Sequence, residues 1–269
     1  MFDETIHKII HGNCLQELSL LPNSVDLTFL DPPFNQQKDY VSWQDDLPEN
    51  EYWQMIAEIC CLVFEKTNAG GAIYFMQREK NAEQVLRILR QSGWEFQNLI
   101  AWKKMTSAVP GTMRYGKSFQ IIGFATKGTR PKTFNRLRID PPLLKNQKME
   151  RENGIFVTDI WDDIRELTSG YFAGDEAIRN DAGERFHKQQ SPIALLLRII
   201  LSSSKAGDTI LDPFAGTGTT AIVAKQLKRN SLNIEIDKAN AEQIKRRLAE
   251  MRKADLINKY FENYKCTNN

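Results

Sequence analysis

A buried strand that ends at two consecutive prolines is the feature that most constrains this chain. Residues 24–30 are largely apolar or β-branched, which predicts a buried strand. Pro32 and Pro33 then exclude further ladder hydrogen bonds and fix a rigid turn. Asp31, Pro32 and Phe34 would therefore present a carboxylate, a carbonyl and an aromatic ring at the carboxyl end of a strand. Ligands bind at that edge of open α/β sheets. An aspartate that only caps a turn is the structural alternative.

A second stretch, residues 209–220, predicts a short strand, a glycine turn and the start of a helix. Gly216 and Gly218 leave room for a ligand to approach the backbone, and the helix amino terminus offers unpaired N–H groups. The dinucleotide-binding GxGxxG pattern is not met, because the third glycine is missing. Residues 231–235 predict the next strand, and its final Glu235 suits a ribose diol. The stretch therefore predicts a pocket for a ligand with an anionic group at one end and a ribose at the other.

Length and composition are those of an ordinary globular protein. The 269 residues suit one large domain or one domain with an insertion, and 41% of them are hydrophobic and 26% charged. No stretch is long enough to span a membrane, and a signal-peptide pattern is missing, so we expect a cytoplasmic protein without membrane contact. The four cysteines lack CxxC spacing and only three histidines are present, so free thiols and no metal site are expected.

The small net charge of +2 hides a strong asymmetry along the chain. Residues 103–148 contain eleven Lys or Arg and one acid, whereas residues 149–187 contain ten acids and four Lys or Arg. A run of charges is usually a solvated surface. In a chain that already predicts a ligand pocket, the basic run favours a polyanion such as nucleic acid.

The order of expected elements indicates the fold class. Helices are expected at 50–66, at 81–91 and from Ser191-Pro192, and strands at 72–76, 98–102 and 119–125. Helices between most strands indicate an α/β fold with a doubly wound, mostly parallel sheet. Residues 35–50 are a candidate lid. A last long helix is expected from Lys238 towards Tyr264, and the tail from Cys266 is expected to fray.

Residues 128–186 break this order, because prolines are frequent and periodicity is weak. We therefore predict an inserted, irregular segment there. The chain would then consist of a first half at 1–127, the insertion at 128–186 and a second half at 187–269.

Two motifs in this chain resemble those of the S-adenosylmethionine-dependent DNA amino-methyltransferases, which make N6-methyladenine or N4-methylcytosine. The family's (D/N/S)-P-P-(Y/F/W) motif is matched at 31–34, and its FxGxG motif at 214–218. The catalytic motif precedes the cofactor motif here, a circularly permuted order that is similar to the beta group of the family. The resemblance implies a Rossmann-like methyltransferase fold and a target recognition region at 128–186.

The resemblance also implies roles for individual residues. Residues 187–192 are similar to the family's HPTQKP element with Ser191 at the lysine, and Gly12-Asn13 to its Gly-Asp. The implied catalytic residues are Asp31, Pro32, Pro33 and Phe34. The implied contacts to S-adenosyl-L-methionine are Gly12, Asn13, Cys14, Asp31, Gln190, Ser191, Asp212, Pro213, Phe214, Ala215, Gly216, Thr217, Gly218, Thr219, Thr220, Glu235 and Ile236. The implied DNA contacts are Lys103, Lys104, Arg114, Lys117 and Arg130. Trp102 belongs to the family's W-x-K region or, equally, to the core.

The expected reaction is methylation of an exocyclic amine in double-stranded DNA. Asp31 and the Pro32 carbonyl would accept the amine protons, and Phe34 would stack on a base flipped out of the duplex. Within the family Asp at the first motif position usually accompanies adenine, so N6-adenine is preferred and N4-cytosine is the alternative. A methyltransferase for RNA or protein glutamine is disfavoured by Asp31 and by the motif order. The intact motif disfavours a non-catalytic DNA-binding module. The sequence does not decide whether the protein forms a homodimer or whether a cognate restriction endonuclease exists.

Overall fold

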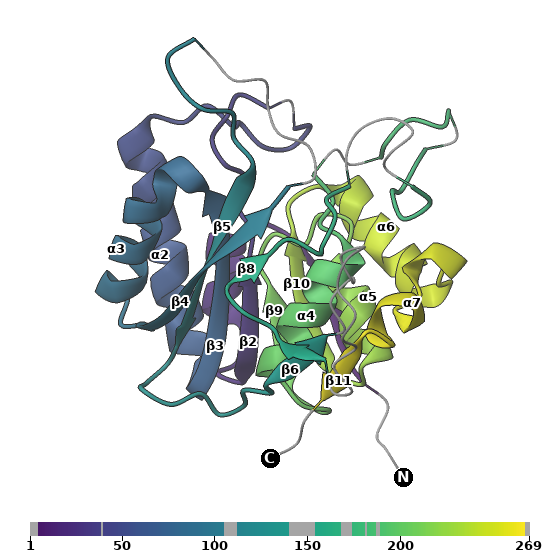
Figure 1. Ribbon diagram of the computed structural model, residues 1–269. Coiled ribbons are helices and arrows are strands. Elements are labelled where there is room, and N and C mark those ends of the chain that lie inside the picture. Colours follow the sequence, from purple (N-terminus) through teal and green to yellow (C-terminus); the bar gives the residue numbers. More distant parts are fainter. Residues whose placement is uncertain are drawn as a thin grey trace.

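The computed structural model describes residues 5–38, 40–104, 112–139, 154–167, 174–180, 182–186 and 189–266. Its centre is an eight-stranded sheet with helices on both faces (Figure 1). The strands, in their order across the sheet, are β1 (His7–His11), β10 (Asn230–Glu235), β9 (Thr209–Asp212), β2 (Val25–Leu30), β3 (Thr67–Arg78), β5 (Phe119–Thr126), β4 (Glu95–Lys103) and β8 (Ile160–Trp161).

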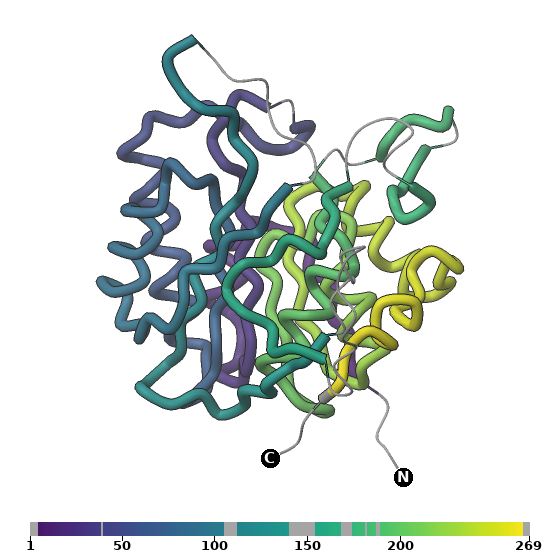
Figure 2. Tube along the Cα trace, viewed as in Figure 1, coloured from purple at the N-terminus to yellow at the C-terminus, as the bar shows by residue number. Residues whose placement is uncertain are grey.

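The two halves of the chain meet in the middle of this sheet. The strand β2 pairs in parallel with β9, with Leu27 opposite Ile210 and Thr28 opposite Leu211. Figure 2 shows these segments, purple and green and far apart in the sequence, side by side. Only β5 runs against its neighbours, β3 and β4. The prediction of a mostly parallel α/β sheet is therefore confirmed.

Helices cover both faces of the sheet, and every residue of β2 is therefore buried. Phe29 packs into the cluster that includes α4 and part of α5, whereas Leu30 packs into the cluster that includes α1, α2 and α3. Successive strand residues point to opposite faces, which explains this division. Figure 1 shows α2 and α3 on the left and α4, α5, α6 and α7 on the right. The helices are α1 (Cys14–Leu20), α2 (Glu49–Lys66), α3 (Ala82–Gln91), α4 (Ile193–Ser203), α5 (Thr219–Gln226), α6 (Lys238–Ala249) and α7 (Asn258–Phe261). No helix among the described residues has the length and apolar character needed to cross a membrane.

The end of the chain differs from the single long helix that we predicted. The helix α6 ends at Ala249, and a 3-10 turn (Lys253–Asp255), α7 and the strand β11 (Tyr264–Cys266) follow. Asp255 is fully buried and binds Arg247 and Arg252. A carboxylate in that position turns the chain back on α6, so the prediction of one helix was wrong. The predicted fraying from Cys266 was also wrong at that residue, which pairs with Leu137.

The predicted insertion contains short strands. The strands β6 (Leu137–Ile139) and β7 (Ile155–Phe156) form a three-stranded sheet with β11, and β8 extends the main sheet beside β4. The beginning of the insertion lies at the amino ends of β2 and β3, where the Lys132 ammonium binds the Asp26 and Asp208 carboxylates at 2.7 and 3.2 Å. Figure 1 shows this part at the bottom, whereas residues 174–180 and 182–186 lie at the top right. The division at 128 and 186 stays a prediction.

Candidate functional site

A cavity of about 820 Å³ opens at the carboxyl ends of β2, β9 and β10. All predicted catalytic and cofactor-binding residues line it except Gly218. The two motifs are thus brought together, although about 180 residues separate Asp31 from Gly216 in the sequence. The volume lies within the usual range for small-molecule sites, roughly 300–1,000 Å³.

Asp31 lies inside this cavity, where its surroundings change its acidity. The Ser191 hydroxyl donates a hydrogen bond of 3.1 Å to Asp31 Oδ2. Burial raises the pKa of Asp31 to about 7, and the nearby Asp212 carboxylate adds to this rise. The Ser191 hydrogen bond and the charges of Lys104 and Lys38 act in the opposite direction. A carboxyl group with a near-neutral pKa can therefore accept or share protons at ordinary pH.

The turn between β2 and the following loop is held from α2. The Tyr52 hydroxyl donates to the Pro33 carbonyl at 2.7 Å, and Gln77 Nε2 donates to the Tyr52 oxygen at 2.9 Å. The loop that follows is folded around the buried Asp45 carboxylate, which accepts backbone N–H groups from residues 35, 36 and 38. Tyr52 and Gln77 could not be predicted from the sequence, since nothing in their spacing connects them to the Pro-Pro turn.

The predicted lid borders the cavity through residues 40–43. The Ser42 hydroxyl donates to Asp237 Oδ2 at 2.8 Å, which links this loop to the amino terminus of α6. Its closure over a ligand stays a prediction.

The glycine turn has the backbone geometry that the sequence indicated. Gly216 and Gly218 have φ angles of 53° and 80°, which only glycine adopts readily. The Gly216 N–H donates to Glu235 Oε2 at 2.7 Å. Gly218 does not line the cavity, because a Cβ there would point at Ile244 in α6, 2.6 Å from Cγ2. Gly218 therefore packs closely against α6 beneath the turn, and its predicted contact with the cofactor stays a prediction.

Glu235 and Asn13 both border the cavity, and both already accept hydrogen bonds. Besides Gly216, the Glu235 carboxylate accepts the Asp237 N–H at 2.8 Å. Asn13 caps α1, with Oδ1 accepting the Leu15 N–H at 2.9 Å. A contact from Asn13 Oδ1 to an amine would have to use the second lone pair of that oxygen. Burial raises the pKa of Glu235.

The predicted DNA-binding lysines and arginines lie in different surroundings. Lys104 lines the cavity with Nζ 3.3 Å from the centre of the Trp102 ring, and burial lowers its pKa to about 8. Trp102 is only 2% exposed, donates to the Ile164 carbonyl and also lines the cavity, so both of the roles left open for it stay possible. Lys117 pairs with Glu79 at 2.9 Å, whereas Lys103 and Arg114 are exposed near the same edge.

Arg130 lies at the opposite edge of the sheet from Asp31. It follows β5, which ends at Thr126 opposite Ala72, near the amino end of β3. The backbone beside it is fixed there, since the Lys132 N–H donates to the Gly70 carbonyl at 2.7 Å. The antiparallel direction of β5 therefore places Arg130 away from the other basic residues, and its predicted contact with DNA stays a prediction. This position concerns only the start of the predicted insertion. His187 and Lys188, from the element similar to HPTQKP, lie outside the described residues.

The cavity fits a nucleoside-containing cofactor with a charged amino-acid end. The Thr219 hydroxyl at the amino terminus of α5 is buried, lines the cavity and has no hydrogen-bond partner among the described residues. A buried hydroxyl in that state offers a contact to a polar ligand group. Within the described part of the chain, no group of three or more His, Cys, Asp or Glu side chains is placed to hold a metal ion.

Fold and site together define an α/β methyltransferase, and comparisons with known proteins identify the family. The DNA methylase family N6_N4_Mtase matches residues 25–246. The chain is 31% identical over 243 residues to the Type II methyltransferase M.HpaI from Haemophilus parainfluenzae, covering 90% of this chain and 74% of that protein. It is 32% identical over 283 residues to the DNA adenine methyltransferase YhdJ from Escherichia coli, covering 96% and 86%. The chain belongs to the S-adenosylmethionine-dependent DNA methyltransferases of the N6/N4 family.

Solved structures agree with the fold. The M1.HpyAVI–SAM complex has a TM-score of 0.59 at 21% identity and covers 90% of this chain and 99% of that one. The cytosine-N4-specific PvuII DNA methyltransferase has a TM-score of 0.64 at 15% identity and covers 97% and 95%. At these identities the likeness supports the Rossmann-like methyltransferase fold alone.

Proposed function

We propose that this enzyme methylates the exocyclic N6 of adenine in double-stranded DNA at a specific sequence. The observation that carries this proposal is the shared cavity, which holds the Asp31 carboxylate and the glycine turn at Gly216 together. Asp at the first motif position favours adenine over cytosine. The similarity to the adenine methyltransferase YhdJ supports the same choice. The names of the Type II relatives support a role beside a restriction endonuclease, with an orphan enzyme or a homodimer as further possibilities.

In the proposed mechanism Asp31 and Pro32 act on the target amine. Its nitrogen is a weak nucleophile, because the lone pair is delocalised into the base. The amine donates one hydrogen bond to the Asp31 carboxylate and one to the Pro32 carbonyl, which favours a tetrahedral nitrogen, and the single proton released as the N–C bond replaces the S–C bond can pass to Asp31. The bond from Tyr52 to the Pro33 carbonyl keeps this turn rigid, and fixed geometry supplies much of a catalytic effect.

The remaining residues bind and orient the reactants. S-adenosylmethionine supplies an electrophilic methyl group, so the protein needs to contribute only binding, orientation and electrostatics. Phe34 lies at the cavity wall, where it would stack on the flipped base. Flipping costs a few kcal/mol, which stacking and backbone contacts offset.

DNA would bind over the edge of the sheet at which the cavity opens. Lys103, Arg114 and Lys117 lie at this edge and would contact phosphates, which makes binding depend on salt. Arg185 and Phe186, at the end of the predicted insertion, line the cavity at this edge. We therefore assign target recognition to the later part of the predicted region 128–186.

One experiment tests the reaction and the modified base. DNA methylated by the purified enzyme is digested to nucleosides, which are then separated by chromatography. We expect N6-methyldeoxyadenosine, and none from Asp31→Ala, although calorimetry should show that this variant still binds the cofactor. Detection of N4-methyldeoxycytidine would show that the enzyme is instead an N4-cytosine methyltransferase. An active Asp31→Ala would refute the catalytic role of Asp31.

A further inference from the structure

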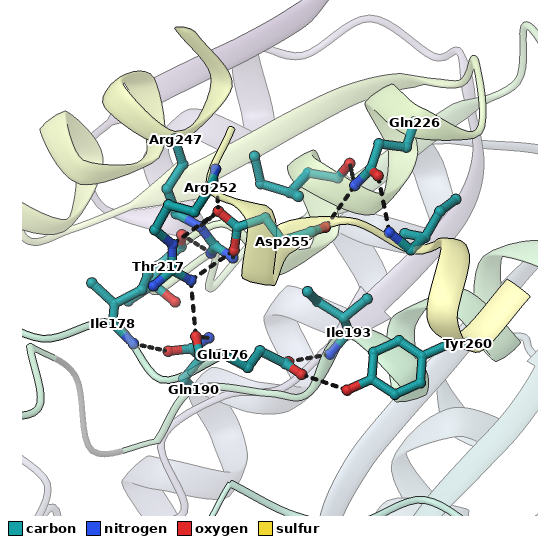
Figure 3. A network of polar contacts seen from close by, with 12 residues as sticks. Glu176, Ile178, Gln190, Ile193, Thr217, Gln226, Arg247, Arg252, Asp255 and Tyr260 are labelled. Carbon is teal, nitrogen blue, oxygen red and sulfur yellow. Dashed lines mark hydrogen bonds and ion pairs between the residues drawn. The ribbon is translucent and has the colours of Figure 1, made fainter. Parts of the chain in front are cut away.

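A network of buried polar groups connects the cofactor turn with the C-terminal segment (Figure 3). Arg247 in α6 is 1% exposed and donates to the Thr217 carbonyl at 2.6 Å. Its other nitrogen binds the fully buried Asp255 carboxylate at 2.7 Å. Arg252 also binds Asp255, and it donates to the Glu176 carbonyl at 2.9 Å. The glycine turn is therefore connected through two arginines to a residue of the insertion.

Glu176 continues the network to the start of α4. Its carboxylate accepts the Ile193 N–H at 2.6 Å and the Tyr260 hydroxyl at 3.0 Å. Gln190 Nε2 donates to the Glu176 carbonyl at 3.0 Å, and Gln190 Oε1 accepts the Ile178 N–H at 3.0 Å. Figure 3 shows Glu176 between Gln190 and Tyr260. Glu176 therefore holds both Gln190, which precedes α4, and Ile193, the first residue of α4.

The turn that leads into α4 contains Ser191, whose hydroxyl donates to Asp31. The helix α4 has no side-chain cap of its own at Pro192, so Glu176 supplies the cap from outside the helix. We propose that Glu176 is a positioning residue for methyl transfer, held by Tyr260 and Arg252 so that Gln190 and Ser191 present the serine hydroxyl to Asp31. This inference rests on the proposed catalytic role of Asp31.

The cost of burying Glu176 supports a role beyond stability. The side chain is 4% exposed, and burial raises its pKa even though two donors contact it. Burying a carboxylate is expensive, and an apolar side chain would fill the same space more cheaply. What the carboxylate adds is a fixed direction for two donors from different elements, the Ile193 N–H and the Tyr260 hydroxyl.

The test is the pH dependence of the single-turnover methylation rate. Asp31 faces Ser191, Asp212, Lys104 and Lys38, and it must be ionised to accept amine protons. The rate should therefore fall as the pH drops through the pKa of Asp31. Because the Ser191 hydroxyl lowers that pKa, Ser191→Ala should move this acid limb to higher pH by about one unit. Glu176→Ala should move it in the same direction.

Further variants separate positioning from folding. Glu176→Gln should keep the wild-type pH profile, since its amide oxygen can still accept from the Ile193 N–H and its amide nitrogen can donate to the Tyr260 oxygen. Tyr260→Phe is a second, smaller change at the same carboxylate and should also shift the limb upwards. Glu242→Gln, which alters an exposed ion pair with Lys245 on α6, is the matched control and should leave the profile unchanged.

A double variant decides whether Glu176 acts through Ser191. In Ser191→Ala/Glu176→Ala the limb should move no further than in Ser191→Ala alone. Rates that drop equally at every pH in Glu176→Ala and Tyr260→Phe, with no shift, would overturn the positioning role. If instead Asp31→Ala stays active, or if the wild-type rate does not fall at low pH, the proposed catalytic role of Asp31 fails, and the inference about Glu176 fails with it.

Discussion

Replacing Gly218 by alanine tests how the glycine turn is built. A Cβ at Gly218 would lie 2.6 Å from Ile244 Cγ2 and 2.8 Å from Ile244 Cγ1, and φ is +80°. Gly207 provides the matched control, because its φ is +86° and a Cβ there would meet nothing within 4 Å. Gly207→Ala therefore isolates the backbone strain, whereas Gly218→Ala adds a steric clash with α6.

The two contributions can be sized separately. An alanine in the left-handed region costs roughly 1–2 kcal/mol. Overpacking a core adds about 1–3 kcal/mol, so Gly218→Ala should lose roughly 2–5 kcal/mol of unfolding free energy. At roughly 2–4 °C per kcal/mol for a domain near this size, Tm should fall by on the order of 10 °C in Gly218→Ala and by only a few degrees in Gly207→Ala.

Thermal unfolding of both variants, with and without S-adenosylmethionine, provides the measurement. Gly218→Ala should also weaken the stabilisation by the cofactor, because the displaced turn carries Thr217 and Thr219. Adding Ile244→Ala removes the two clashing carbons, so the double variant should lose less free energy than the sum of the single losses. Equal losses in the two glycine variants, or strict additivity with Ile244→Ala, would refute the packing role of Gly218.

Three further predictions concern the chemistry of the site. Methylation by the wild-type enzyme should fall as the pH drops below about 7, where Asp31 becomes protonated; a rate that is constant between pH 5 and 8, roughly, in buffers of constant ionic strength would contradict this. Thr219→Val should keep or raise Tm, because a buried hydroxyl without a partner is lost, yet weaken cofactor binding about tenfold in calorimetry; unchanged affinity would exclude a contact with Thr219. Arg114→Ala should lower the slope of log affinity against log salt for DNA by about one, whereas Arg130→Ala at the far edge should not; equal effects would contradict the assignment of edges.

Much of this site was predictable because both motifs stop strands. Pro32 and Pro33 exclude a longer β2, and Gly216 and Gly218 permit a turn that other residues adopt with difficulty. Local chemistry therefore fixed where the ligand-binding edge lies. The resemblance to a family then supplied the cofactor, which the fold and the sequence relatives support.

The parts that were missed depend on contacts between distant residues. The position of Arg130 follows from the antiparallel direction of β5, and no local pattern encodes strand direction. The end of α6 at Ala249 depends on the ion pairs of Asp255 with Arg247 and Arg252. The helical periodicity of the sequence gives no sign of these contacts. Lys104 follows the end of β4 and lines the cavity, which the sequence did not indicate, and its predicted contact with DNA stays a prediction.

The electrostatics of the cavity connect cofactor binding with catalysis. Asp31, Asp212 and Glu235 lie at the ends of the adjacent strands β2, β9 and β10, and burial raises the pKa of each. A positive charge in the same cavity favours their ionised forms, so a sulfonium nearby would keep Asp31 ionised for the catalytic role that we propose. The demethylated product is a neutral thioether and lacks this attraction. The carboxylates therefore attract the sulfonium before transfer, and this attraction is lost once the methyl group has been transferred.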